Sequence, residues 1–408
     1  MSADPVVPGD AGLVAPLSGA RTEERRVRPH ARPLALLAIG HLVVDIYQGA
    51  VLALLPFLRN ALLLSYAGTG TIILVSNLTS SVIQPLFGYF ADRLSRRWLL
   101  PVSVFTAGFG TALMGVAPNY AVLQLFVVVS GLGVAAYHPE GFRVASEVSG
   151  DRKATGLSFF SIGGNAGFAL GPPITTALVA GFGLPGSLGL LLPALVVSLL
   201  LAGAPPSSAP VAPRRPAAPL LGARETMWGA MGLLIVVVVL RSWTQFGFTT
   251  FIPFFYIDHL GADPRLVGPL LFVFLGAGAV GTLVGGPIAD RWGPRRFLVS
   301  VFSLAAPLGV GFLFARGLWS FVLLGALGFV LVSTFSVSVV LAQAYLPRHP
   351  GMAAGLNAGF AIGAGGMGVA LLGWVADHWG LLMALGVTAA MPFLGFVATL
   401  FLPEPRRP

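Results

Sequence analysis

Residues 88–97 read GYFADRLSRR, and residues 286–296 read GPIADRWGPRR. Both stretches place a glycine four residues before an Asp-Arg pair, and their aspartates are 198 positions apart. A second pair of similar stretches, GLSFFSIGGNAGFALG from Gly156 and GLNAGFAIGAGGMGVA from Gly355, is offset by 199 positions. Because both offsets are close to half of the 408 residues, the sequence predicts two homologous halves.

The apolar residues are grouped in long segments. They make up 56% of the chain, and charged residues make up only 10%, against roughly 25% in soluble globular proteins. Segments of about 20 apolar residues span a bilayer as helices, because a helix satisfies its own backbone hydrogen bonds. The sequence therefore predicts an all-α membrane protein with twelve transmembrane helices, at 33–59, 69–91, 98–117, 119–142, 153–180, 183–203, 226–257, 266–290, 295–315, 317–345, 350–376 and 380–402.

The twelve segments divide into two pseudo-symmetric bundles of six. The stretch 204–225 between them is rich in proline and serine and is predicted to be a cytoplasmic linker. The N-terminal bundle is predicted at 33–203 and the C-terminal bundle at 226–403. Cytoplasmic tails are predicted at 1–32, which we expect to be disordered, and at 404–408. Two six-helix repeats with a binding site at their interface form a recurring transporter plan.

The basic residues are distributed unevenly between the two faces of the predicted bundles. If the N-terminus is cytoplasmic, only Arg59, Arg265 and Arg316 lie on the opposite face, and Arg241 lies inside a segment. The remaining lysine and arginine residues share the face that carries both termini, which is the positive-inside asymmetry of cytoplasmic loops. This asymmetry accounts for the net charge of +9, so we expect no nucleic-acid partner.

Several other functions lack the residues that they need. The chain has no cysteine, which excludes disulfides and thiolate metal sites. GAGAVG at 276–281 and GAGGMG at 363–368 match a dinucleotide fingerprint but lie inside apolar segments, so we interpret them as helix-packing glycines. The only lysine, Lys153, lies outside any P-loop sequence, and no HExxH sequence is present. We therefore expect no cofactor, no metal and no enzyme activity.

The two copies of the Asp-Arg stretch resemble the cytoplasmic loop motif of the major facilitator superfamily of transporters. The resemblance covers the chain from about residue 33 and implies the twelve-helix fold of that superfamily. In the superfamily, the motif ties the cytoplasmic ends of helices together until the carrier changes access, and its glycines allow close helix approach. Ser95 stands where a glycine is usual, and Pro294 replaces a basic residue in the second copy. The resemblance implies a gating role for Gly88, Asp92, Arg93, Arg97, Gly286, Asp290, Arg291 and Arg295.

A closer resemblance lies in the first and fourth segments. GHLVVDIYQGAVLALLPFL, from Gly40, and AYHPEGFRVASEVSG, from Ala136, resemble the fosmidomycin resistance proteins, which are proton-driven exporters of the same superfamily. GNAGFALGPP at 164–173 resembles the antiporter motif of helix 5, although Thr175 stands where a further glycine is expected. The resemblance implies a multi-pass protein of the bacterial inner membrane that exports a small molecule in exchange for protons. We expect it to be monomeric.

His41 and Asp45 lie inside the first apolar segment. Their i, i+4 spacing puts both side chains on one helix face. A charge at the bilayer centre costs at least roughly 2.5–3.5 kcal/mol, so we expect this face to point to the protein interior. We interpret the two residues as proton-coupling groups. The alternative is an interhelical hydrogen bond that only packs the bundle.

Arg241 lies midway along the seventh segment, at the position that corresponds to Val43 in the first half, between His41 and Asp45. If the halves are pseudo-symmetric, Arg241 enters the same cavity from the opposite bundle. It would then serve either as the counter-ion of an intramembrane acid or as the anchor of an anionic substrate. Its planar fork of donors suits phosphate and phosphonate groups. A purely structural ion pair is the third interpretation.

The fourth segment carries His138, Glu140 and Arg143 in the pattern H-P-E-x-x-R. Glu140 and Arg143 are three residues apart, which allows them to pair on one helix. We interpret these three residues as a proton relay or a cytoplasmic substrate gate. A solvated helix end is an equal alternative.

Further polar residues are predicted to line the cavity beside Arg241 and Arg143. They are Gln48, Asn165, Trp243, Gln245 and Gln343. The aromatic run TTFIPFFY at 249–256 is interpreted as an interfacial belt rather than an outer gate. Asp377 and His378, near the end of the eleventh segment, are interpreted as surface residues.

These features predict a secondary transporter that exports a small drug-like or anionic compound, similar to fosmidomycin, by proton antiport with alternating access. Proton-coupled import of an organic anion is a second hypothesis, which the direction of substrate-driven pH change would distinguish. A transport-inactive membrane sensor or scaffold is the hypothesis from another class.

Overall fold

The computed structural model describes residues 31–84, 86–87, 98–150, 153–204 and 226–404, and no strand occurs in these ranges. The predicted tails and linker lie almost entirely outside them. The first half forms α1 (Ala31–Leu62), α2 (Tyr66–Asn77), α4 (Leu99–Leu113), α5 (Tyr120–Val148), α6 (Lys153–Phe182) and α7 (Leu191–Ala202). The second half forms α8 (Trp228–Phe254), α9 (Val267–Trp292), α10 (Pro294–Phe314), α11 (Leu318–Val332), α12 (Thr334–Tyr345), α13 (Pro350–Trp379) and α14 (Leu381–Leu400).

The helices follow the order of the predicted segments. Ten helical stretches among the described residues are long and apolar enough to cross a membrane, by length and composition. The other two predicted segments correspond to α6, which has 30 residues, and to α2, which continues through a π-helical turn at Leu78–Val82. The all-α membrane fold is therefore confirmed, and the crossing of the membrane by α2 and α6 stays a prediction.

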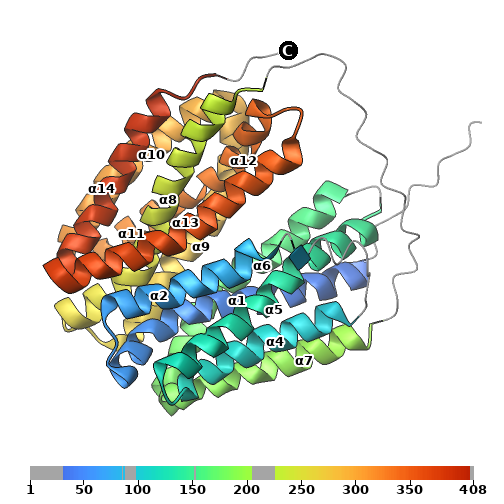
Figure 1. The fold of residues 1–408 in the computed structure, drawn as a ribbon, viewed down its shortest axis with the longest axis vertical. Helices are drawn as coiled ribbons and strands as arrows, with labels where there is room; N and C mark the ends of the chain where they lie inside the picture. The colour runs from blue at the N-terminus through green and yellow to red at the C-terminus, as the bar shows by residue number, and fades with distance from the viewer. Residues whose placement is uncertain (1–30, 85, 88–97, 151–152, 205–225, 405–408) are drawn as a thin grey trace, which may run out of the picture.

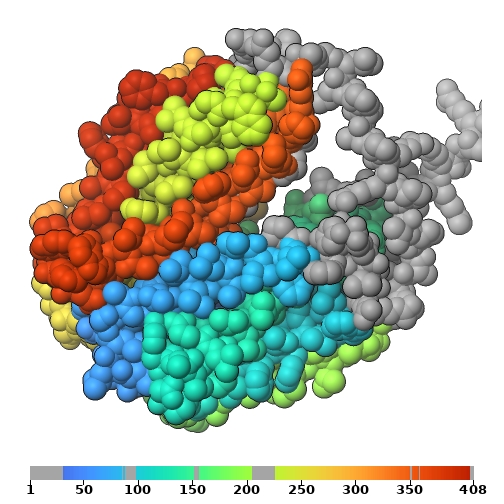
Figure 2. Space-filling view, in the orientation of Figure 1, coloured from blue at the N-terminus to red at the C-terminus, as the bar shows by residue number. Residues whose placement is uncertain are grey.

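Figure 1 shows the helices in two bundles, α1–α7 and α8–α14, with one half of the chain in each. The bundles contact each other mainly through α2 against α13 and α6 against α9. They touch at the end where α1 and α13 finish. Figure 2 shows a hollow between them toward the end where α1 and α13 begin. The space between the bundles is therefore open toward one end of the molecule and closed at the other.

A row of glycines brings α6 directly against α1. At four-residue intervals, glycines of α6 lie on successive backbone carbonyls of α1: Gly163 on Ala38, Gly167 on Leu42 and Gly171 on Ile46. A Cβ atom at any of these glycines would overlap the carbonyl oxygen opposite it. The stretch that resembles an antiporter motif therefore has a packing role here, because only small residues permit so close a helix approach.

The aromatic run 249–256 lies in a core that is shared by the two bundles. Phe251 and Phe254 are 0% and 1% exposed, and they belong to one apolar cluster with Leu54 of α1 and Ile72 of α2. The prediction of an interfacial belt is therefore wrong, because these rings fill the closed end of the molecule instead of facing its surface.

Candidate functional site

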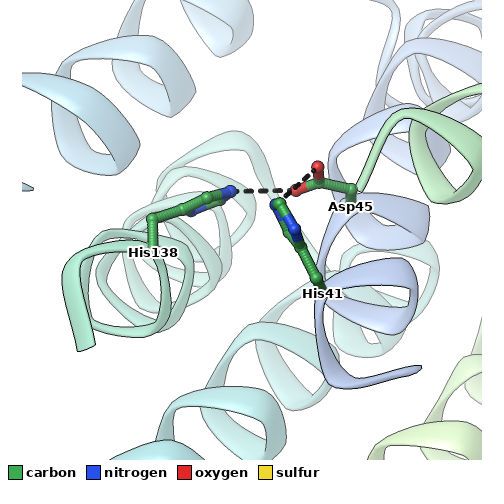
Figure 3. A group of neighbouring side chains, drawn as sticks. All are labelled: His41, Asp45 and His138. Atoms are coloured by element: carbon green, nitrogen blue, oxygen red, sulfur yellow. Dashed lines mark ion pairs between the residues drawn. The ribbon is translucent and has the colours of Figure 1, made fainter. Parts of the chain in front are cut away.

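Three ionisable side chains form a cluster inside the N-terminal bundle (Figure 3). His41 and Asp45 come from α1, and His138 reaches them from α5. Nε2 of His41 lies 3.4 Å from one carboxylate oxygen of Asp45, and Nε2 of His138 lies 3.2 Å from the other. His41 and Asp45 are 5% and 9% exposed. The structure thus brings together three of the four residues that we predict to couple protons.

The backbone determines which nitrogen of each imidazole faces Asp45. Nδ1 of His41 lies 2.9 Å from the carbonyl oxygen of Phe160, and Nδ1 of His138 lies 2.9 Å from that of Val134. A carbonyl oxygen only accepts, so each Nδ1 carries a hydrogen and donates it. Each Nε2 then faces a carboxylate oxygen, and this contact is a hydrogen bond only when a proton lies between the two atoms. The cluster therefore offers two positions for a transferable proton.

Neighbouring residues hold the cluster in place. Nε2 of Gln48 donates to the Asp45 carboxylate at 2.6 Å, and the His41 ring stacks on Phe160 at a centroid distance of 4.2 Å. Gly164 of α6 packs against the cluster, and a Cβ atom there would lie 2.6 Å from Oδ2 of Asp45.

His41, Asp45 and His138 also have a spacing that could hold a metal ion, since one ligand atom from each lies within 4.8 Å of the others.

The predicted pair of Glu140 and Arg143 forms in α5 and includes a third residue. Arg143 donates to both carboxylate oxygens of Glu140, at 2.9 and 2.5 Å, and to Glu147 at 2.6 Å. Glu140 is 2% exposed, and α5 continues past it to Val148. The interpretation as a solvated helix end is therefore wrong, because the helix continues beyond Arg143 and the Glu140 carboxylate is buried. Sequence analysis does not select Glu147, although its i, i+4 spacing from Arg143 is a readable signal.

Arg241 lies buried in the C-terminal bundle, on α8, and is 5% exposed. Its guanidinium donates to Gln245 at 2.9 Å and to Ser242 at 3.1 Å, and it lies 5.5 Å from the centroid of the Phe335 ring. Within the described part of the chain, no carboxylate lies within 4 Å of it, and its Nε has no hydrogen-bond partner. The interpretations of Arg241 as a counter-ion or a structural ion pair are therefore wrong in this conformation.

The uncharged residues predicted to line the cavity differ in their surroundings. Gln48 and Gln245 each hydrogen-bond to the buried charged residue of their own bundle. Trp243 is half-buried, and its indole nitrogen has no hydrogen-bond partner in the described ranges. Asn165 is exposed on α6, and Gln343 is half-buried on α12. Only the two glutamines are thus tied to the charged groups.

The first copy of the predicted gating motif, with Gly88, Asp92, Arg93 and Arg97, lies outside the described residues. The second copy spans the turn between α9 and α10, where Pro294 starts α10 and Gly293 has φ +91. A proline at the first helical position fits this turn, because its missing N–H has no partner within the helix in any case.

The second copy departs from the predicted geometry at one position. The space beside Gly286 is open, whereas the preceding Gly285 packs against Ser333. The prediction of close helix approach at Gly286 is therefore wrong in this conformation. Arg295 donates to the carbonyl oxygen of Leu400 at 2.6 Å, which ties the start of α10 to the end of α14. Asp290 and Arg291 are exposed and form no ion pair with any described residue.

Comparison with solved structures supports the fold. The chain superposes on a bacterial homologue of the human lysosomal transporter Spinster, in an inward-facing and unoccupied conformation, with a TM-score of 0.76. The sequences are 16% identical, and the match covers 93% of this chain and 98% of that one. A D-xylose–proton symporter matches with a TM-score of 0.69 and 17% identity over 92% and 98% of the two chains. At this low sequence identity, the two comparisons show that the fold is shared and nothing further.

Comparison of sequences gives the family. The model of the Major Facilitator Superfamily matches residues 37–368. The fosmidomycin resistance protein of Escherichia coli (strain K12) is 31% identical over 396 residues, 96% of this chain and 97% of the relative. YfnC of Bacillus subtilis (strain 168), an MFS-type transporter, is 31% identical over 90% of this chain and 92% of its own length. The chain therefore belongs to the Major Facilitator Superfamily of membrane transporters, and within it to the family of the fosmidomycin resistance protein.

Proposed function

We propose that this transporter exports a small drug-like or anionic compound in exchange for protons. The observation that carries the proposal is the buried cluster of His41, Asp45 and His138, with its two positions for a proton. A buried carboxylate is costly unless partners compensate its charge, so gaining or losing a proton changes the free energy of any conformation that encloses it. Conformations that differ in proton affinity and in substrate affinity couple the two ligands.

Arg241 supports an anionic substrate. A buried cation costs free energy unless an opposite charge compensates it, and among the described residues no carboxylate lies within 4 Å of this one. A bound anion would supply that charge, and the guanidinium fork matches the oxygens of a phosphate or phosphonate group. Trp243 and Gln245, on the same helix, would add contacts to the substrate. Fosmidomycin, which gives the Escherichia coli relative its name, is the first compound to test.

In the proposed cycle, substrate enters the open hollow from the cytoplasm and binds at Arg241. A proton from the outside then loads the cluster around Asp45 and favours release of the substrate to the outside. The proton leaves to the cytoplasm when the bundles return. Glu140 and Arg143, further along α5, would act as the relay or gate on the cytoplasmic side. Alternating access of this kind matches the inverted and repeated plan of secondary transporters.

We also propose that the protein is a monomer in the bacterial inner membrane with both termini in the cytoplasm. The uneven distribution of arginines supports this orientation. The open hollow then faces the cytoplasm, and the end that carries Arg59 faces the outside.

A proton-flux assay in oriented proteoliposomes tests the proposal. A pH gradient is imposed, fosmidomycin is added on the cytoplasmic side, and decay of the gradient is followed for the unmodified protein and for Asp45→Asn. The matched control is Asp263→Asn, since Asp263 is exposed and, among the described residues, its side chain accepts a hydrogen bond only from the nearby Arg265 amide. We expect fosmidomycin to accelerate decay for the unmodified protein and for the control, but not for Asp45→Asn.

The other outcomes would each change the proposal in a different way. Equal decay of the gradient in all three proteins would mean that Asp45 has a structural role. A substrate-driven pH change of opposite sign would indicate import with protons, and substrate binding without any flux would indicate a sensor or scaffold. The assay is repeated with a chelator, because a metal ion bound by the cluster would occupy the positions assigned to protons.

A further inference from the structure

Four polar contacts join the two bundles at the closed end of the molecule. From the N-terminal bundle, Arg59 lies near the end of α1 and Tyr66 starts α2. From the C-terminal bundle, Asp258 lies in the π-helical turn after α8, and Asp377 lies in the last turn of α13. None of these residues belongs to the buried proton cluster or to the surroundings of Arg241.

Asp258 binds two side chains of the opposite bundle with one oxygen. Its Oδ2 lies 2.9 Å from Nη1 of Arg59 and 2.9 Å from the hydroxyl of Tyr66. The guanidinium of Arg59 also lies over the Tyr66 ring, 4.0 Å from its centroid. These contacts hold Arg59 between a carboxylate and an aromatic face, which is a favourable setting for a guanidinium.

Asp377 completes the N-terminal cap of a helix in the other bundle. The first four N–H groups of a helix lack partners within the helix. In α2, the N–H groups of Tyr66 and Ala67 donate to the two carboxylate oxygens of Asp377, at 2.8 and 2.9 Å. The N–H of Gly68 donates to the hydroxyl of Ser65, which is the N-cap residue of α2. Two of the three side-chain hydrogen bonds that cap α2 therefore come from a residue of the other bundle, 311 positions from Tyr66.

We propose that Asp258 and Asp377 form an outer latch that holds the two bundles together while the hollow is open at the other end. Every contact of the latch crosses between the bundles, so every one breaks when the bundles part at this end. Arg59 and Asp258 retain 23% and 24% side-chain exposure, so water reaches the groups that are released. A latch of this kind biases the conformational equilibrium without locking it, because exposed ion pairs contribute little free energy.

The absence of cysteine from the chain allows a direct test. The substitutions Leu63→Cys and Leu318→Cys provide attachment sites for spin labels at the closed end, one in each bundle. The two leucines are 91% and 77% exposed, so a label can reach both positions. Pulsed electron spin resonance then measures the label distance, without substrate or pH gradient, in Asp377→Ala, Asp258→Ala and the control Asp263→Ala. Because substrate and protons play no part, the result is independent of the proposed function.

We expect Asp377→Ala and Asp258→Ala each to raise the population with a long label distance by about two- to fivefold, in line with the energy of exposed ion pairs. Asp263→Ala should leave the distribution unchanged. The exchange variant Arg59→Asp/Asp258→Arg keeps both charges at the contact and should restore the short label distance. This test remains valid even if one of the single variants folds poorly. Unchanged distributions in both latch variants, or an equal change in Asp263→Ala, would overturn the proposal.

Discussion

Nε2 of His138 lies 3.2 Å from the Asp45 carboxylate, and this contact joins α5 to α1. The contact between His41 and Asp45, at 3.4 Å, stays within α1. A proton held between His138 and Asp45 therefore strengthens the attraction between two helices, whereas a proton held between His41 and Asp45 acts within one. Of the two contacts with the Asp45 carboxylate, the one made by His138 is thus the one through which a shared proton acts between helices.

His138→Asn should uncouple transport from the pH gradient. The substitution removes Nε2 and with it the hydrogen bond that the imidazole makes to Asp45 when protonated. We expect gradient-driven uptake into inside-out vesicles to fall by about a hundred- to ten-thousandfold, the range of a positioned proton-transfer group. Substrate binding should change little, because Arg241 lies in the other bundle.

His378→Asn provides the matched control for this variant. His378 is exposed at the end of α13, and its Nδ1 contacts the Trp374 carbonyl in the same i−4 geometry that His138 has with Val134. Normal coupling in His378→Asn with loss in His138→Asn would support the role of the cluster. Normal coupling in both variants would remove His138 from the proton path.

Arg241→Ala should weaken binding of an anionic substrate. Hydrogen bonds to a charged group contribute roughly 1.5–3 kcal/mol, so we expect the affinity to fall by about ten- to a hundredfold. Arg241→Lys should restore only part of it, because an ammonium lacks the planar fork. Isothermal titration of fosmidomycin into the purified proteins measures both effects. Arg265→Ala, at an exposed arginine, is the control, and equal affinity in all variants would place the substrate elsewhere.

The sequence predicts contacts within one helix better than contacts between helices. His41 with Asp45 and Glu140 with Arg143 follow from i, i+4 and i, i+3 spacing, and the structure contains both pairs. The contact of His138 with Asp45 depends on how α5 packs on α1, and no spacing in the sequence encodes that packing. Resemblance to a known family links these two segments, but it does not give the distance between the side chains.

Asp377 shows most clearly that the sequence does not predict contacts between the bundles. Its position near the end of an apolar segment favours a surface residue, and it is indeed exposed. Its carboxylate nevertheless caps α2, because the two bundles meet at that end. The prediction of an interfacial belt for the aromatic run 249–256 is wrong for the same reason. The composition of the run suits a membrane interface, but the contact between the bundles buries it. A correct prediction for either feature would have required the relative placement of the two bundles, which the sequence does not give.

Gly167→Ala should destabilise the protein. A Cβ atom at this position would overlap the carbonyl oxygen of Leu42, and neither helix backbone can move away without disturbing the neighbouring glycine contacts. Overpacking of this kind costs about 1–3 kcal/mol. We expect a lower midpoint of thermal unfolding in detergent for Gly167→Ala. The control is Gly355→Ala, since the space beside Gly355 is open, and an equal midpoint in the two variants would show that α1 and α6 adapt easily.

Glu140→Gln should cost more stability than Glu147→Gln, although both carboxylates bind the same arginine. Glu140 is 2% exposed and takes two hydrogen bonds from Arg143, whereas Glu147 takes one and retains 21% side-chain exposure. Replacing the buried carboxylate weakens two charge-assisted hydrogen bonds where little water reaches, at a cost of about 1.5–3 kcal/mol, while the partly exposed partner is replaced by water at a cost below about 1 kcal/mol. Thermal unfolding of the two variants measures the difference. Equal destabilisation of the two variants would contradict this expectation and would mean that Arg143 shares its charge evenly between the two carboxylates.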